Sequence, residues 1–214
     1  MNIESAAAPP FFENSFLVWC EETREAVLID PGDAVGEIVE QVKSRKLEVK
    51  KILLTHAHLD HITGVARAKR EFGVPICLHK ADLFLYDAIV EQGRMFGFET
   101  SPQPPVDHFY LPNERLTFGR YVVDVRHTPG HCPGGVCLAI GRADGRDDER
   151  ELFVGDTLFA GSIGRTDLPG GDHALLLASI RDQLLVYPEG TIVHSGHGPD
   201  TTVGDERATN PFLR

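Results

Sequence analysis

The sequence of 214 residues contains no apolar run close to the roughly 20 residues that a membrane-spanning helix needs. Its start, Met1–Pro10, has neither a basic segment nor an apolar core, so no secretory signal is visible. Basic residues are few, because 21 Lys and Arg against 32 Asp and Glu give a formal net charge of −11. This balance argues against partners such as nucleic acids and anionic membranes, whose binding requires a basic excess.

Cysteine is also scarce, with four residues at Cys20, Cys77, Cys132 and Cys137. Without a secretory signal, we expect these to be reduced thiols of a cytoplasmic protein. The last two are spaced C-x4-C, which is wider than the C-x2-C pair of a structural zinc site. The G-x-S-x-G turn of serine hydrolases and the G-x4-G-K-[ST] loop of nucleotide-binding proteins are both absent.

Short runs rich in Val, Ile, Leu and Phe alternate with longer amphipathic stretches along the whole chain. The length and the lack of a linker predict a single domain over residues 1–214, with two groups of strands packed together and helices outside. Expected strands are Phe16–Cys20, Ala26–Ile29, Lys51–Thr55, Ile76–His79, Leu116–Phe118, Tyr121–His127, Val136–Ile140, Glu151–Val154 and Thr191–Ser195. Expected helices are Asp33–Lys46, Asp60–Phe72, Ala81–Phe96, His173–Val186 and Thr202–Thr209. The proline-rich loop Gly97–Asn113 is expected to overhang the functional pocket.

The most informative motif is a run of three histidines and one aspartate directly after the apolar strand at Lys51–Thr55. His56 and His58 are two residues apart, so in extended chain their side chains point to the same side. Asp60 and His61 follow at the start of a helix and can face the same space. Neutral imidazole and carboxylate are ligands of zinc, iron and manganese, so the run predicts a metal site.

Three further ligand-type residues occur where the chain leaves later predicted strands. His131, Asp156 and His197 follow the strands Tyr121–His127, Glu151–Val154 and Thr191–Ser195, each beside a glycine that permits a sharp turn. A single histidine in such a position is usually an ordinary hydrogen-bonding residue. The recurrence of all three at strand ends, together with the H-x-H-x-D-H run, favours a shared metal centre.

The order of these seven residues resembles the metallo-β-lactamase superfamily over nearly the whole chain. The resemblance implies an α+β fold, a four-layer αβ/βα sandwich of two mixed β-sheets flanked by helices, with two divalent metal ions at the sheet edges. Zinc is the expected metal, with iron or manganese as alternatives. The resemblance also implies one ion on His56, His58 and His131, a second ion on Asp60, His61 and His197, and Asp156 bridging both. Asp60 and Asp156 are the carboxylates assigned to catalysis.

The glyoxalase II-like branch of the superfamily matches best, through Gly155–Phe159 and Gly164–Asp167. Two ions that share a water lower its pKa from 15.7 towards 7 and so provide a bridging hydroxide as nucleophile. A thiol leaves readily because its pKa is ~8.5, whereas an amine usually needs a proton donor. The lactamases of the superfamily commonly carry cysteine in place of Asp156. We therefore expect a metal-dependent thioester hydrolase acting on S-D-lactoylglutathione or a similar acyl-thiol.

The chain departs from full-length glyoxalase II enzymes in the parts that bind glutathione. It ends soon after His197, so we expect it to lack the C-terminal helical region of those enzymes. Their substrate-contacting lysine aligns with Arg165, which can still pair with a carboxylate, and a nearby tyrosine aligns with Asp167. Arg165 is therefore the expected substrate-binding residue, unless its guanidinium is occupied by Asp167 in an ion pair.

Two alternatives remain open within the same superfamily. A mononuclear iron persulfide dioxygenase would use the facial set His56, His131 and Asp156, and the Gly164–Asp167 segment also resembles that branch. A lactonase on the same two metals is a further alternative. Asp30, in an Asp-Pro-Gly sequence, either forms a turn or accepts a hydrogen bond from a ligand histidine. The remaining histidines are expected to serve ordinary hydrogen bonding or to lie on the surface: His79, His108, His127, His173 and His194.

Overall fold

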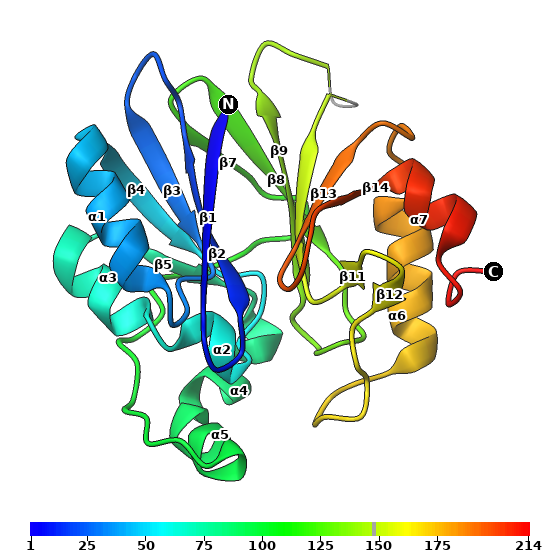
Figure 1. The fold of residues 1–214 in the computed structure, drawn as a ribbon, viewed down its shortest axis with the longest axis horizontal. Helices are drawn as coiled ribbons and strands as arrows, with labels where there is room; N and C mark the ends of the chain where they lie inside the picture. Colours follow the sequence, from blue (N-terminus) through cyan, green and yellow to red (C-terminus); the bar gives the residue numbers. More distant parts are fainter. Residues whose placement is uncertain (147–148) are drawn as a thin grey trace. The chain divides into compact units, whose positions relative to one another are not determined.

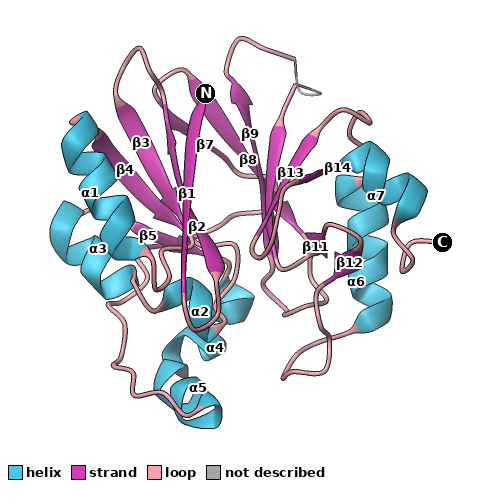
Figure 2. Ribbon diagram, in the orientation of Figure 1, coloured by secondary structure: helices cyan, strands magenta, loops and turns pink. Residues whose placement is uncertain are grey.

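The computed structural model describes residues 1–146 and 149–214, and the chain divides into two compact units, Met1–Tyr110 and Leu111–Arg214. Each unit is organised around one mixed β-sheet with helices packed on it (Figures 1 and 2). The expected α+β class with two mixed sheets flanked by helices is confirmed.

The sheet of the first unit, all of whose residues are described, has six strands in chain order. These are β1 (Asn2–Ala8), β2 (Glu13–Trp19), β3 (Glu25–Ile29), β4 (Glu48–Leu53), β5 (Ile76–Leu78) and β6 (His108–Phe109). β1 to β3 pair antiparallel, and β3 to β6 pair parallel. The parallel part follows the expected β-then-α order, whereas β1 was not predicted because its residues lack a clear apolar alternation.

Helices α1 (Val35–Arg45) and α3 (Val65–Phe72) pack against this sheet and against each other. α1 buries Val35, Ile38, Val39 and Val42, which recur at helical spacing and form one apolar face. α3 ends at Gly73, whose φ of +67° is the left-handed conformation expected for the residue that caps a helix.

The helix predicted over Asp60–Phe72 is interrupted after one turn. The structure has α2 (Leu59–Ile62), then a break at Thr63 and Gly64 before α3 begins. The backbone N–H of Gly64 donates to the carbonyl of Pro31 at 2.9 Å. A Cβ at position 64 would lie 2.4 Å from the carbonyl oxygen of Gly32, so only glycine permits this approach. The interruption therefore sets the direction of the short helix that carries Asp60 and His61.

The helix predicted over Ala81–Phe96 is likewise divided, into the 3-10 turn Lys80–Asp82, α4 (Leu83–Asp87) and α5 (Ile89–Phe96). The chain turns at Ala88, whose φ of −87° and ψ of 16° depart from helical values. α5 ends at Gly97 in the left-handed conformation. The predicted loop Gly97–Asn113 follows and contains only the two-residue strand β6 as regular structure.

Within its described residues, the second unit has a sheet of six strands in the order β14-β13-β10-β9-β8-β7. Its strands are β7 (Arg115–Phe118), β8 (Tyr121–His127), β9 (Val136–Arg142), β10 (Glu151–Gly155), β13 (Ile192–Ser195) and β14 (Thr201–Thr202). β10 and β13 pair parallel, and the other pairs are antiparallel. A separate small hairpin of β11 (Leu158–Phe159) and β12 (Ser162–Ile163) was not predicted.

Helix α6 (His173–Ser179) continues into a π-helical turn, Ile180–Leu184, and covers this second sheet. Asp172 caps the N-terminus of α6, since its side chain accepts a hydrogen bond from the N–H of Leu175 at 3.0 Å. Side chains from this helix and from β9, β10 and β13 form one buried core cluster. The last helix, α7 (Val203–Thr209), matches its predicted position.

No helix in residues 1–146 or 149–214 is long and apolar enough to cross a membrane. All four cysteines lie in these ranges, where they are buried and are not joined in disulfides.

His194 on β13 forms a buried charge network whose effect on stability depends on pH. Its Nε2 lies 2.9 Å from Glu151 and its Nδ1 lies 3.0 Å from Asp200, while its ring stacks on Phe153. Burial tends to lower the pKa of His194, but the two carboxylates outweigh it and raise the pKa above its usual value.

Because the folded pKa is raised, this network stabilises the protein fully below the unfolded pKa of ~6.5 and loses its effect as pH rises through the folded value. We expect the free-energy gap between wild type and His194→Asn to be larger at pH 5.5 than at pH 9. The difference should be on the order of 1 kcal/mol, since Asp200 is half exposed and screened by solvent. Urea unfolding of chelator-treated protein measures it, with His127→Asn as an exposed-histidine control. A gap that grows with pH would contradict this assignment.

Candidate metal centre

The loop between β4 and α2 carries the first group of predicted metal ligands. His56, His58 and His61 are buried, with 2%, 8% and 0% of their surfaces exposed. Asp60 lies on α2 beside His61 and remains partly accessible. The strand-to-helix transition thus gathers three imidazoles and one carboxylate within the first unit, as the sequence predicted.

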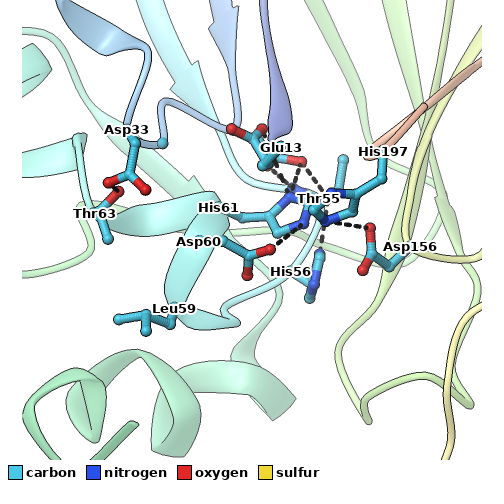
Figure 3. A network of polar contacts seen from close by, with 12 residues as sticks. Glu13, Asp33, Thr55, His56, Leu59, Asp60, His61, Thr63, Asp156 and His197 are labelled. Atoms are coloured by element: carbon cyan, nitrogen blue, oxygen red, sulfur yellow. Dashed lines mark hydrogen bonds and ion pairs between the residues drawn. The ribbon is translucent and has the colours of Figure 1, made fainter. Parts of the chain in front are cut away.

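The ring of His61 is oriented by carboxylates on both sides (Figure 3). Its Nδ1 lies 3.1 Å from Asp30 Oδ2, and its Nε2 lies 3.9 Å from Asp60 Oδ2. When Nδ1–H donates to Asp30, the lone pair of Nε2 is available on the side of Asp60. Ligand atoms of Asp30, His56 and His61 lie within 4.8 Å of one another. The imidazoles of this group suit a divalent metal ion, because a neutral imidazole with a hydrogen-bonded second nitrogen is the usual form of a histidine ligand.

Asp30 acts as the acceptor behind this histidine rather than only as a turn residue. Its Oδ1 accepts from the N–H of Thr55 at 2.7 Å, and its Oδ2 accepts from the Thr55 hydroxyl at 2.5 Å. The backbone N–H of Asp30 donates to the carbonyl of Leu53 at 3.1 Å, which extends the pairing of β3 with β4 by one residue. The second of the two interpretations of Asp30 is therefore the one that the structure supports.

The second unit brings together the other three predicted ligands. Nδ1 of His131 lies 2.7 Å from the carbonyl oxygen of Arg165, so this nitrogen carries the proton and donates it. Nε2 of His131 lies 3.7 Å from Asp156 Oδ2, and Nε2 of His197 lies 3.7 Å from Asp156 Oδ1. Each oxygen of Asp156 thus faces a different histidine, which is the arrangement that a carboxylate bridging two metal ions requires.

A cavity of about 450 Å³ in the second unit adjoins these ligands and includes Asp156, His197, Phe159 and Arg165 in its lining. Arg165 lines this cavity, and its role in binding substrate stays a prediction. Its guanidinium is engaged by Asp167 through two hydrogen bonds of 2.7 Å each. The hydrogen bonds from Arg165 hold the pKa of the Asp167 carboxyl at about 2, so this carboxylate stays ionised at neutral pH.

If Arg165 binds a substrate carboxylate, as the resemblance to glyoxalase II-like enzymes implies, Asp167 would compete with that carboxylate for the guanidinium. We expect Asp167→Asn to lower the KM for S-lactoylglutathione about two- to fivefold, because the pair is solvent-exposed and individually weak. The KM for an uncharged thioester should not change. Steady-state kinetics on both substrates measure the effect, and Arg165→Gln in the same background should remove it. A KM for S-lactoylglutathione that is unchanged in Asp167→Asn would show that Arg165 does not bind the substrate carboxylate.

Glu13, at the start of β2, belongs to this region but was not predicted from the sequence. Its carboxylate is buried, with Oε1 3.9 Å from His61 Nδ1, and its Oε2 accepts the hydroxyl of Ser15 at 2.9 Å. Burial raises the pKa of Glu13 well above its ordinary value, although nearby His61 opposes the shift. No sequence signal marked it, because a glutamate next to a turn is normally solvated.

Gln92 on α5 is a second residue that sequence patterns missed. Its Oε1 accepts from the N–H of Leu59 at 3.0 Å, and its Nε2 donates to the carbonyl of Ala57 at 3.1 Å. Asp82 accepts from the N–H of Ala57 at 3.2 Å. The side chains of Gln92 and Asp82 thus hold the backbone at Ala57 and Leu59, on either side of His58. Only the tertiary structure reveals this role, since α5 follows the loop by about 30 residues.

The remaining histidines take the ordinary roles expected of them where a contact is described. His79 accepts the N–H of Ala81 at 3.3 Å, and His127 contacts the carbonyl of Pro133 at 2.9 Å.

Comparison with known proteins gives the family. The model of the metallo-beta-lactamase superfamily matches residues 8–197. The chain belongs to this superfamily. It is 37% identical to "Hydroxyacylglutathione hydrolase GloC" of Haemophilus influenzae, with 100% of this chain and 98% of that protein aligned. Two solved structures are each 40% identical to it.

The first of these structures is the BLEG-1 B3 metallo-beta-lactamase, with a TM-score of 0.89 over 99% of each chain. The second is TTHA1623 in a di-iron-bound form, with a TM-score of 0.84 over 98% of this chain and 100% of that one. The metallo-β-lactamase fold is therefore established. Membership in this superfamily of hydrolases that use divalent metals agrees with the histidine and aspartate groups of both units.

Proposed function

We propose that the protein is a dinuclear metallohydrolase that cleaves thioesters, with S-D-lactoylglutathione or a related acyl-thiol as substrate. The observation that carries this proposal is the position of Asp156, whose two oxygens each lie 3.7 Å from Nε2 of a different histidine. An aspartate in this position could offer one oxygen ligand to each of two ions. The similarity to GloC over the whole chain supports the same reaction class.

In this proposal, His56, His58 and His131 would hold one ion, Asp60, His61 and His197 would hold the other, and Asp156 would contribute to both. All seven residues belong to one superfamily domain over 1–214. Two divalent ions supply, when bound, a hydroxide nucleophile at neutral pH and positive charge for the developing oxyanion. Zinc is the first candidate and iron the second, the latter because the relative TTHA1623 binds two iron ions.

The chain's own residues have distinct tasks in such a reaction. Asp30 and the carbonyl of Arg165 fix the protonated nitrogens of His61 and His131, so that the opposite nitrogens remain basic. A thiolate leaving group needs no proton donor at neutral pH, because a thiol has a pKa of ~8.5. The thioester bond thus suits a site without an adjacent general acid better than an amide does. We place the reaction in the cytoplasm, a proposal supported by four buried cysteines that are not joined in disulfides.

The test combines metal analysis of the purified protein with turnover assays. We expect about two divalent ions per chain and hydrolysis of S-lactoylglutathione that chelation abolishes and added metal restores. One tightly bound iron per chain, with oxygen consumption on glutathione persulfide and no thioesterase activity, would instead identify the dioxygenase alternative. Hydrolysis of lactones but not thioesters would identify a lactonase.

A further inference from the structure

The first unit contains a second cavity, of about 340 Å³, that the metal ligands do not line. Its walls come from the β1–β2 turn, α2, α3, α5 and the segment of residues 98–103. This segment belongs to the proline-rich loop whose length suggested a functional role. The apolar part of the lining is Phe11, Leu59, Ala66, Ile89 and Phe98.

Leu59 is the lining residue of this cavity that stands next to candidate metal ligands in the sequence. It lies between His58 and Asp60 in the sequence, it is 2% exposed, and its side chain lines the cavity. Figure 3 shows the Leu59 side chain pointing away from the Asp60 carboxylate. A group bound in the cavity therefore contacts Leu59 in the short helix α2, and the next residue of that helix is the candidate ligand Asp60.

The cavity is built by hydrogen bonds that join its walls. Gln103 accepts from the N–H of Ala66 at 2.8 Å, and Thr100 donates to the carbonyl of Ile89 at 2.9 Å. The ring of Phe11 meets Phe98 edge-on with a centroid distance of 5.2 Å. These contacts tie the segment of residues 98–103 to α3, α5 and the β1–β2 turn. The space is thus a formed pocket rather than a gap beside an untethered loop.

The charged residues of the lining select against anions. Asp33 and Glu99 both face the cavity, and among its described lining residues none is lysine or arginine. The Thr63 hydroxyl donates to Asp33 at 2.8 Å and holds that carboxylate at the wall (Figure 3). A carboxylate-bearing ligand would meet two like charges here, whereas an uncharged or amine-bearing group would not. The walls therefore match an apolar ligand group that carries no negative charge.

We infer that this cavity is a specificity subsite that takes an apolar aryl or branched-alkyl group of the thioester substrate. The inference rests on the proposed thioesterase function and names the substrate class that the site prefers. The apolar group can belong to the acyl side or to the thiol side of the thioester. An apolar group on either side would make the same contacts with the cavity, and substrates that vary one side at a time distinguish the two cases.

The experiment uses uncharged thioesters of N-acetylcysteamine whose acyl group is acetyl, phenylacetyl or 4-carboxyphenylacetyl. For the thiol side, the acetyl thioester of phenylmethanethiol is compared with that of N-acetylcysteamine. We expect kcat/KM to rise about tenfold or more when a phenyl group is added on the side that the cavity serves, since apolar contacts of this size give such factors. The 4-carboxylate should remove most of that gain.

Ala66→Leu adds bulk inside the cavity without lowering helix propensity, and the phenyl preference should fall to within about twofold. Arg70→Leu, at an exposed position of the same helix, is the matched control and should keep the preference. Phe98→Ala, which widens the cavity, should also weaken the phenyl preference. It replaces Ala66→Leu in the test if that variant fails to fold. Calorimetric binding of N-ethylphenylacetamide, an amide with neither a thioester nor a metal-binding thiol, gives a readout independent of turnover.

The outcomes separate the two proposals. If thioesters are hydrolysed without a phenyl preference, or if the preference survives in Ala66→Leu, the subsite inference is wrong and the thioesterase proposal stands. If no thioester is hydrolysed, the thioesterase proposal is wrong. In that case the amide still decides the cavity: binding that Ala66→Leu weakens at least tenfold supports an apolar ligand site, and its absence rejects one.

Discussion

Asp156→Ala should reduce thioester turnover by more than about 10²-fold and lower the metal content from two ions per chain to one or none. Loss of a residue that merely supports a ligand costs 10–100-fold, so loss of a shared ligand should cost more. Asp156 sits at the end of β10, with each oxygen 3.7 Å from a ligand histidine, so its removal affects both sets of donors. Metal analysis and kcat/KM on the same preparation measure the two effects together.

The matched control for this variant is Asp182→Ala, which removes an exposed carboxylate from the same unit. It should retain both ions and its turnover. Asp156→Asn is a further useful comparison, since an amide keeps the shape of the side chain but offers only one good oxygen ligand. Two ions and undiminished turnover in Asp156→Ala would show that this aspartate is not a metal ligand.

Asp30→Asn should weaken metal binding about 10–100-fold, because Asp30 orients the candidate ligand His61 although it is not itself assigned as a ligand. The amide keeps the left-handed backbone, since asparagine tolerates the φ of +45° at this position. It removes the negative charge that stabilises the Nδ1–H form of His61 at 3.1 Å. A competition assay with a chromophoric chelator measures the metal dissociation constants of variant and wild type.

A chelator assay of Asp87→Asn, an exposed aspartate at the end of α4, controls for the loss of one charge in the first unit. Unfolding of the metal-free proteins provides the second readout. Asp30→Asn should retain most of its metal-free stability, because the amide oxygen can still accept from the N–H of Thr55. Unchanged metal affinity would mean that Asp30 supports the fold only.

Local patterns in the sequence are sufficient to predict most of the strands and helices of the fold. Strands such as Tyr121–His127 are long, apolar and flanked by turn residues, and the predicted bounds match β8 as observed. The helix Asp60–Phe72 was predicted as continuous, because a single glycine does not reliably end a helical pattern. Its break depends on Gly64 approaching Gly32, which is more than 30 residues away, and no local pattern contains that contact.

The candidate ligands stood out in the sequence because histidine and aspartate have little other reason to recur at strand ends, and their assignment as ligands stays a prediction. The residues that support them did not. Glu13, Asp82 and Gln92 are common surface residue types, and each reaches the histidine loop from a distant element. The interaction of Arg165 with Asp167 was considered from their spacing, and the structure contains it.

The hydrogen bond from Asp30 to Leu53 makes Asp30 the final residue of the β3–β4 pairing as well as the acceptor for His61. The sheet therefore fixes the orientation of the His61 ring through Asp30, and metal binding would not need to reorient it. The conformational entropy of ordering this ligand is lost once, during folding, and does not have to be lost again at each binding event. If the cavity is a substrate subsite and His61 a metal ligand, as proposed, changes in residues 98–103 would alter substrate preference without altering the sheet that holds His61.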